Sequence, residues 1–417
     1  MHTTDRLHAL DAVRAFALIL GIFFHAALSF VPDLAKASDQ SDVIWLIGDN
    51  SPSIALSVVV GITHLFRMSL FFFIAGFFAH LVYHRKGAGA FLRDRSKRIA
   101  LPFVVGWCVI IPMMGAAWHW AQAKTGTPPI PKMFFGPGTM QWSVNHLPLF
   151  HLWFLYYLLL IYVLVVGGRH LFADQLDPQG AFRKQIDAWL ERALNKRYAP
   201  LLLSIPVGAA AAISSVALKT GIPTPDHSLV PEIIPLANFG VAFFGGWLFH
   251  RNTALLNVLS MQLKSSLWMG LLAWLVAGCA LAVAILNPGM TPIVFKFLVG
   301  YLLAVTAWYW SFGIVGYALK KFMQPSARIR YAADSSYWLY LMHLPLVCAL
   351  QVWVAYWPIH WSIKYPLIVT IAFAVLLTTY HYLVRFTFIG AVLNGRKHAR
   401  VVQRPVNDLA VQKVTTD

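Results

Sequence analysis

Ten apolar runs, each long enough to cross a lipid bilayer, dominate this chain of 417 residues. A hydrocarbon core about 30 Å thick needs roughly 20 helical residues, because a helix rises about 1.5 Å per residue. With 59% hydrophobic and 12% charged residues, the composition excludes an ordinary soluble domain. The sequence predicts an all-α, polytopic transmembrane helical bundle with spans near 12–31, 61–83, 99–118, 149–168, 199–217, 233–250, 265–286, 293–319, 335–355 and 364–386.

The basic residues are distributed unevenly between the two sides of the predicted bundle. With the amino terminus inside, the cytoplasmic segments carry 25 lysines and arginines and the outer segments carry five. The positive-inside bias therefore predicts that both termini are cytoplasmic. A formal net charge of +17 first suggests a nucleic-acid partner. Because the charges lie in short loops between apolar runs, we expect a lipid bilayer as partner and no nucleic acid.

The chain is predicted to form one membrane domain over 1–396, followed by a polar, basic cytoplasmic tail over 397–417 without folded structure. The amino terminus lacks a basic region, short apolar core and cleavage site, so the first span is expected to remain in the mature protein. Cys108, Cys279 and Cys348 fall within apolar runs without metal-ligand spacing. This pattern indicates small buried residues rather than disulfides or a metal site.

The first predicted span carries Arg14 near its start and His25 deep inside. Eleven helical residues place the two side chains on one face, about 16 Å apart. A charged group inside a span costs at least about 2.5–3.5 kcal/mol on insertion scales, so it usually faces a protein cavity. Two interpretations stay open: a functional pair, or an arginine that reaches the headgroups and a histidine that packs with a hydrogen bond.

Further polar residues gather in the outer half of other spans. His64 and Arg67 lie near the outer end of the second span, on adjacent helix faces. His151 opens the fourth span, and His343 lies near mid-membrane, where Pro345 frees backbone carbonyls for it to meet. Singly, each is more often a satisfied structural residue. Together they favour a polar cavity that opens outward.

The connections on the two sides of the bundle carry different residue types. On the cytoplasmic side, Arg93, Arg95, Lys97 and Arg98 precede the third span, either as an orientation signal alone or as a site for a phosphorylated ligand. The outer connections are rich in tryptophan, as in the 119–148 segment. Those tryptophans suit either the interfacial aromatic belt or a stacking surface for sugar rings.

Five motifs in order carry a resemblance to a known family: Leu10-Asp11 with Arg14 and His25, His64 to Met68 running into Phe72 to Gly76, Arg95 to Arg98, His151 to Leu155, and Ser336 to Pro345. From about Arg6 to Arg396 the chain resembles the acyltransferase-3 family of integral membrane acyltransferases. It is most similar to the branch that contains the periplasmic glucan succinyltransferases. A tryptophan-serine-leucine element of other members is absent, and His-Leu-Trp-Phe-Leu stands instead, which favours the glucan-modifying branch.

The resemblance implies a bacterial inner-membrane O-acyltransferase that moves an acyl group, succinyl in this branch, from cytoplasmic acyl-CoA to a hydroxyl of a periplasmic glucan. In the family, the residue matching His25 acts in catalysis and the residue matching Arg14 assists the donor. We predict His25 as the catalytic base, with Arg67 stabilising an oxyanion or the free carboxylate of a succinyl group. Acyl-CoA binding is predicted for Arg14, Arg95 and Arg98.

We further predict substrate binding by His64, His151, Trp153, Tyr340 and His343. No metal and no cofactor is expected besides the acyl-CoA co-substrate. A transporter or flippase with a histidine-lined polar pathway is the competing interpretation, and a strict dependence of the product on acyl-CoA would separate the two. A haem protein with histidine ligands is a third, and it would absorb in the Soret region.

Overall fold

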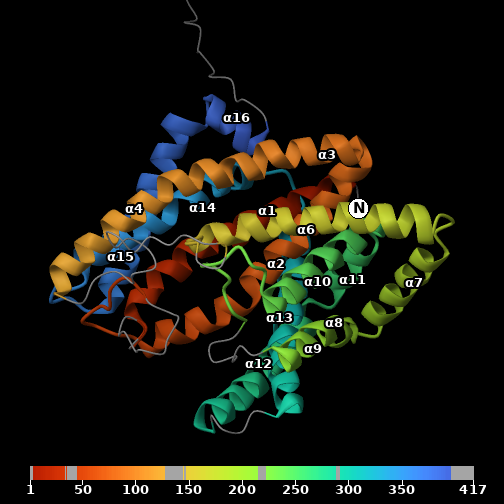
Figure 1. The fold of residues 1–417 in the computed structure, drawn as a ribbon, viewed down its shortest axis with the longest axis horizontal. Coiled ribbons are helices and arrows are strands. Elements are labelled where there is room, and N and C mark those ends of the chain that lie inside the picture. The colour runs from red at the N-terminus through yellow and green to blue at the C-terminus, as the bar shows by residue number, and fades with distance from the viewer. Residues whose placement is uncertain are drawn as a thin grey trace, which may run out of the picture.

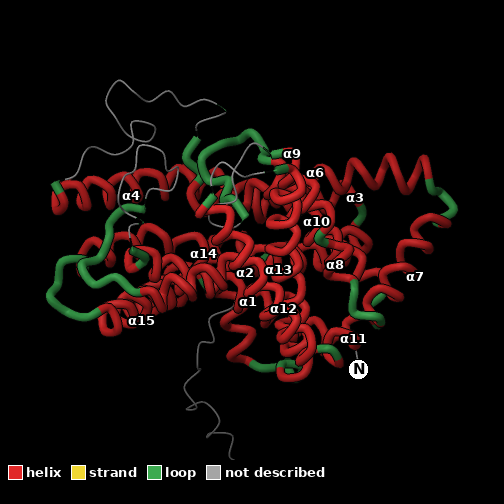
Figure 2. The backbone as a smooth tube through the Cα atoms, turned by 90° about the horizontal axis from the view of Figure 1, so that it is seen from below, coloured by secondary structure: helices red, strands yellow, loops and turns green. Residues whose placement is uncertain are grey.

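The described part of the chain consists of helices and loops and contains no strand, as the computed structural model shows in Figures 1 and 2. It covers residues 3–32, 34, 45–126, 144, 147–214, 222–287 and 292–395. The predicted tail at 397–417 and most of the tryptophan-rich 119–148 segment lie outside these residues. The α-helices are α1 (Thr3–Ala27), α2 (Ile54–Lys86), α3 (Ala88–Arg95), α4 (Leu101–Thr125), α6 (Trp153–Arg169), α7 (Ala181–Asn195), α8 (Ala199–Leu203), α9 (Ile205–Ile213), α10 (Ile233–Arg251), α11 (Leu255–Met261), α12 (Leu263–Leu286), α13 (Ile293–Lys321), α14 (Ala327–Val354), α15 (Trp361–Thr379) and α16 (Phe388–Asn394).

Nine helices within the described residues are long and apolar enough to cross a membrane, which confirms a polytopic helical bundle. The fifth predicted span, 199–217, differs: it is a shorter apolar helix over Ala199–Ile213 that breaks into α8 and α9 at Ser204. Proline explains the break, because Pro206 has no N–H to donate to the carbonyl four residues earlier. The backbone N–H and the hydroxyl of Ser204 both donate to the Pro200 carbonyl, at 3.2 and 2.7 Å.

Helices α1 and α14 run parallel through the centre of the bundle (Figure 1). Gly21 lies beside His343, and one turn further along α1 the carbonyl of Ala26 accepts a hydrogen bond from Gln351, 3.1 Å away. Helix α2 runs the opposite way, because its later residue Phe78 contacts Arg14. We call the end where α1 begins the Arg14 end and the opposite end the Lys364 end. That the Arg14 end faces the cytoplasm stays a prediction from the charge distribution.

Two glycines bring the backbones of α2 and α10 into direct contact. A Cβ atom on Gly76 would lie 1.8 Å from the carbonyl oxygen of Phe243, and one on Gly246 would lie 1.8 Å from that of Phe73. Both neighbours are backbone atoms, so they can make room only if one helix shifts against the other. Small residues that allow backbones to approach closely are a common basis of helix packing in membranes, where lipid supplies no hydrophobic force between helices.

We predict opposite effects for two alanine substitutions on α10. Gly246→Ala should lower the free energy of unfolding by about 1–3 kcal/mol, because overpacking forces the two backbones apart. Gly240→Ala is the matched control: nothing lies within 4 Å of its Cβ position, so it should raise stability by about 0.5–1 kcal/mol through helix propensity. Denaturant titration of the purified protein in detergent measures both. Equal effects at the two positions would contradict this account of the packing.

Hydropathy alone does not separate lipid-facing from core-facing positions, and two cysteines show it. The prediction that all three cysteines are buried is wrong for Cys108 and Cys279, which are exposed on the helix surface. Cys348 on α14 is fully buried, as predicted. Lipid tails are as apolar as a protein core, so an apolar run tolerates cysteine on either face.

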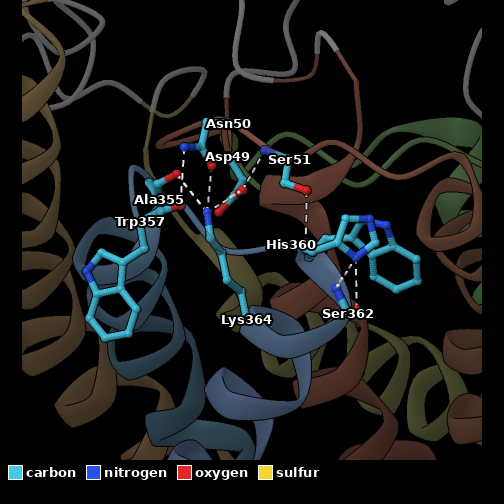
Figure 3. A network of polar contacts seen from close by, with 9 residues as sticks. Asp49, Asn50, Ser51, Ala355, Trp357, His360, Ser362 and Lys364 are labelled. Carbon is cyan, nitrogen blue, oxygen red and sulfur yellow. Dashed lines mark hydrogen bonds and ion pairs between the residues drawn. The ribbon is translucent and has the colours of Figure 1, made fainter.

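A buried lysine fastens the Lys364 end of the bundle (Figure 3). The ammonium of Lys364, at the start of α15, donates to Asp49 at 2.9 Å, to the Asn50 side chain at 2.6 Å and to the Ala355 carbonyl at 3.2 Å. The side chains of the ion pair are 0% and 1% exposed. We call Lys364, Asp49, Asn50 and Ala355 the Lys364 clasp. It ties the segment before α2 to the turn between α14 and α15.

Candidate functional site

One cavity inside the bundle collects most of the residues predicted to act. It lies among α1, α2, α6, α10 and α14, is bordered by residues 222–224 before α10, and holds about 730 Å³ of unfilled space including its mouth. Its polar lining comes from these five α-helices, the 3-10 segment Phe150–Leu152 before α6 and one loop, and the residues are His25, His64, Arg67, His151, Trp153, Asn238, Tyr340, His343 and Thr224. The predicted convergence of imidazoles and a guanidinium at one depth is therefore observed.

His25 and His343 form a hydrogen-bonded pair across the parallel helices α1 and α14. Nδ1 of His25 lies 2.8 Å from Nε2 of His343, and Nδ1 of His343 lies 2.7 Å from the carbonyl oxygen of Tyr340. The backbone beneath His25 is held separately, because the amide of Gln351 donates to the His25 carbonyl at 2.8 Å. The indole of Trp45 stacks over the His25 ring, with centroids 6.1 Å apart. Both the ring and its helix are thus fixed.

Arg67 places a buried positive charge beside this pair. The residue is 7% exposed, and its guanidinium lies over the ring of Phe24, 4.4 Å from the centroid. A Cβ on Gly21 would lie 3.1 Å from an Arg67 amino group, so glycine leaves room for it against α1. No carboxylate lines the cavity, and Nε of Arg67 has no hydrogen-bond partner among the described residues. A buried cation without a counter-ion is costly, so this site favours an anionic ligand.

His151 is held in place by a carbonyl that proline frees. Because Pro345 lacks an N–H, the carbonyl of Leu341 loses its helical partner, and Nε2 of His151 donates to it at 3.0 Å. The Tyr340 hydroxyl donates to the His151 carbonyl at 2.7 Å. The sequence predicted that His343 would contact a carbonyl freed by Pro345. This prediction is wrong, because His151 donates to that carbonyl, whereas His343 is hydrogen-bonded to Tyr340 and His25. Nδ1 of His151 is buried without a partner among the described residues.

The remaining lining residues shape the wall between α2 and α10. Nε2 of His64 donates to the Ile222 carbonyl at 2.9 Å, which ties the loop to α2. Trp153 stacks on Phe239, with ring centroids 5.2 Å apart. Asn238 was not predicted from the sequence; it is 3% exposed and donates to Ser69 across the α2–α10 contact. An asparagine within an apolar run was the signal that could have indicated it.

Three predicted residues lie outside the cavity, at the Arg14 end. Arg14 forms an ion pair with Asp11 at 3.1 Å, and its side chain is 35% exposed. Arg95 and Arg98 both contact Asp94, at 3.6 and 3.3 Å. Along α1 the lining begins at Ala17, one turn beyond Arg14, so the cavity does not reach these three arginines.

Comparison with known proteins gives one match over nearly the whole chain. Residues 7–381 match the family model described as an acyltransferase domain. The chain is also similar to Glucans biosynthesis protein C of Shigella dysenteriae serotype 1 (strain Sd197), at 26% identity over 162 residues, which are 39% of this chain and 38% of that protein. The proteins of the same name from Escherichia coli (strain SMS-3-5 / SECEC) and Salmonella paratyphi B (strain ATCC BAA-1250 / SPB7) are 26% and 25% identical over the same shares. The matched part is thus well under half the length of these relatives. No solved structure matches the chain.

Proposed function

Because this chain belongs to the acyltransferase-3 family of membrane acyltransferases, we propose that it moves a succinyl group from succinyl-CoA to a hydroxyl of a periplasmic glucan in the bacterial inner membrane. The glucan is suggested by the printed name of its relatives. The observation that carries the proposal is the cavity that places an imidazole pair beside a buried guanidinium without a carboxylate.

The proposed reaction is a direct acyl transfer. The acceptor hydroxyl gives its proton to His25 as its oxygen attacks the thioester carbonyl. The new carbon–oxygen bond forms, the carbon–sulfur bond breaks, and the CoA thiolate takes the proton back from the His25 imidazolium. Donors aimed at the developing oxyanion lower the barrier most when they are fixed beforehand. Arg67 is the proposed oxyanion donor, because the N–H groups of the neighbouring imidazoles already donate within the protein.

The donor is proposed to enter from the Arg14 end. Arg14 lies midway along α1, and Arg95 and Arg98 precede α4. The CoA phosphates would lie beside these basic residues. The pantetheine arm would then follow α1 to His25. Because the cavity lining begins only at Ala17, this route requires the helices to separate slightly at that turn when the donor binds.

Mass spectrometry tests the proposed function directly. Periplasmic glucans and lipopolysaccharide would be compared from cells with and without the gene, and purified protein would be incubated with succinyl-CoA and glucan. We expect a succinyl mass increment on the glucan that requires both the gene and the acyl-CoA. Transport of an unmodified glycan without acyl-CoA, or no change in glucan mass, would contradict the proposal.

Replacing Arg67 tests whether the free carboxylate of the donor is recognised here. Arg67→Gln should lower succinyl transfer by about ten- to a hundredfold more than acetyl transfer, because a hydrogen bond to a charged group is worth about 1.5–3 kcal/mol. Arg67→Lys keeps the charge and should retain part of the preference. Competition between succinyl-CoA and acetyl-CoA in one assay measures the ratio. Equal losses with the two donors would argue against this pairing.

A further inference from the structure

The geometry points to His343 as the positioning residue that holds His25 in the tautomer with a basic Nε2. The inference rests on the proposed function only in taking His25 as the proton acceptor. His343 is 1% exposed on α14; its Nδ1 contacts the Tyr340 carbonyl and its Nε2 contacts Nδ1 of His25. These two contacts, taken in order, assign every ring proton of the pair.

The assignment begins at the backbone. A carbonyl oxygen has no proton to donate, so the 2.7 Å contact to Tyr340 requires that Nδ1 of His343 carry one. In the neutral ring, Nε2 of His343 is then an acceptor. The 2.8 Å contact requires in turn that Nδ1 of His25 donate. Nε2 of His25 is left with its lone pair, in the form that a general base needs.

The residues around the pair explain why a histidine suits this position. The orienting partner of a catalytic histidine is often a carboxylate, which fixes the tautomer and stabilises the imidazolium. Here Arg67 lies close by: a Cβ on Gly21 would meet an Arg67 amino group at 3.1 Å and Nε2 of His343 at 3.7 Å. A carboxylate at position 343 would pair with Arg67 and occupy it. Neutral imidazole fixes the tautomer and leaves the guanidinium free for the substrate.

The same contact acts again after proton transfer. When His25 holds a proton on both nitrogens, its Nδ1–H bond to His343 becomes charge-assisted and therefore stronger. His343 thus favours the imidazolium that forms during the attack, and in the proposed reaction it acts through His25 rather than on the reacting atoms. A residue with only a packing role would affect folding and leave the tautomer of His25 unchanged.

The experiment combines a spectroscopic and a kinetic measurement on the full chain in detergent micelles. Nitrogen-15 spectra of histidine-labelled protein should show neutral His25 protonated on Nδ1. His343→Leu, which has no acceptor, should give a mixture of tautomers and lower the single-turnover rate by about a hundredfold. His343→Gln can present its side-chain oxygen where Nε2 was, and should keep the Nδ1–H tautomer and a rate within about tenfold of the unmodified chain.

Each outcome decides whether His343 has a positioning role or only a packing role. A wild-type His25 protonated on Nε2, or an unchanged tautomer and rate in His343→Leu, would overturn the inference. If His343→Leu does not fold, the spectrum of the wild-type chain together with His343→Gln still decides the question. Failure of the proposed function would appear differently, as absent acyl transfer in the wild-type chain while the tautomer of His25 remains as assigned.

Discussion

His25→Gln should lower the single-turnover rate of acyl transfer by about 10²–10⁴-fold, the range that positioned general bases contribute. Glutamine fits beside His343 and Trp45 but cannot accept and return a proton near neutral pH. The fold should persist, because the Gln351 amide holds the His25 backbone carbonyl and not its ring. Rapid mixing of acyl-CoA-loaded protein with glucan measures the rate. Added imidazole should restore part of it in His25→Ala, where the ring's place is empty.

The control for His25 is another histidine outside the cavity. His381 lies in the π-helical segment Tyr380–Val384 after α15 and does not line the cavity. His381→Gln should therefore leave the rate within about twofold of the unmodified chain. Full single-turnover transfer by His25→Gln would remove the catalytic role and leave His25 as a packing residue. A loss that imidazole does not restore would indicate a structural effect instead.

The sequence predicts the depth of a residue in the bundle far better than its partner. The rise per residue along a helix is fixed, so His25, Arg67 and His151 could be assigned to one depth from the ends of apolar runs. Their convergence on one cavity confirms this. Partners depend on how each helix is rotated about its axis and on which helices are neighbours. Hydropathy does not contain that information, because lipid and core are equally apolar.

Three features of the site do not follow from the sequence pattern. Pro345 correctly indicated a free carbonyl, yet only the contact between α14 and the 3-10 segment Phe150–Leu152 before α6 shows that His151 rather than His343 takes it. Gly21 has no side chain and gave no signal, although it lets Arg67 and His343 approach α1. Arg14 and His25 do share α1, but the cavity ends before Arg14, and helical periodicity does not predict where a void closes.

Lys364→Met should lower the free energy of unfolding by about 3–5 kcal/mol, the cost of removing one partner from a buried ion pair. The Asp49 carboxylate, with a side chain 1% exposed, would lose its only charged partner in the Lys364 clasp. Lys124→Met is the matched control at the same end. Lys124 donates to the carbonyls of Val352 and Trp353 and has no carboxylate partner in the described part of the chain, so its loss should cost about 1 kcal/mol. Denaturant titration in detergent measures both variants.

Adding Asp49→Asn to Lys364→Met separates the buried charge from the other contacts. If the penalty comes from an unpaired carboxylate, the double variant should be more stable than Lys364→Met alone, because a neutral amide replaces the charge. Strictly additive losses from Lys364→Met and Asp49→Asn would contradict the coupling. The segment before α2 that carries Asp49 and Asn50 also contains Trp45, which stacks on His25. A weakened clasp should therefore also slow acyl transfer, which the single-turnover assay measures.

The loss of stability in the single variant Lys364→Met should depend on pH in a defined direction. Burial raises the pKa of Asp49 above its ordinary value of 3.8, while the hydrogen bonds from Lys364 and Ser51 oppose the shift. A raised pKa means that the folded chain binds the proton more tightly than the unfolded chain, so this carboxyl's contribution to stability falls as pH rises from 3.8 through the raised value. Without Lys364 the pKa of Asp49 rises further. The loss of stability in Lys364→Met should therefore be largest near neutral pH and should shrink as the pH is lowered, because the carboxyl becomes neutral. A loss that grows on acidification would show that Asp49 is not the group left unpaired.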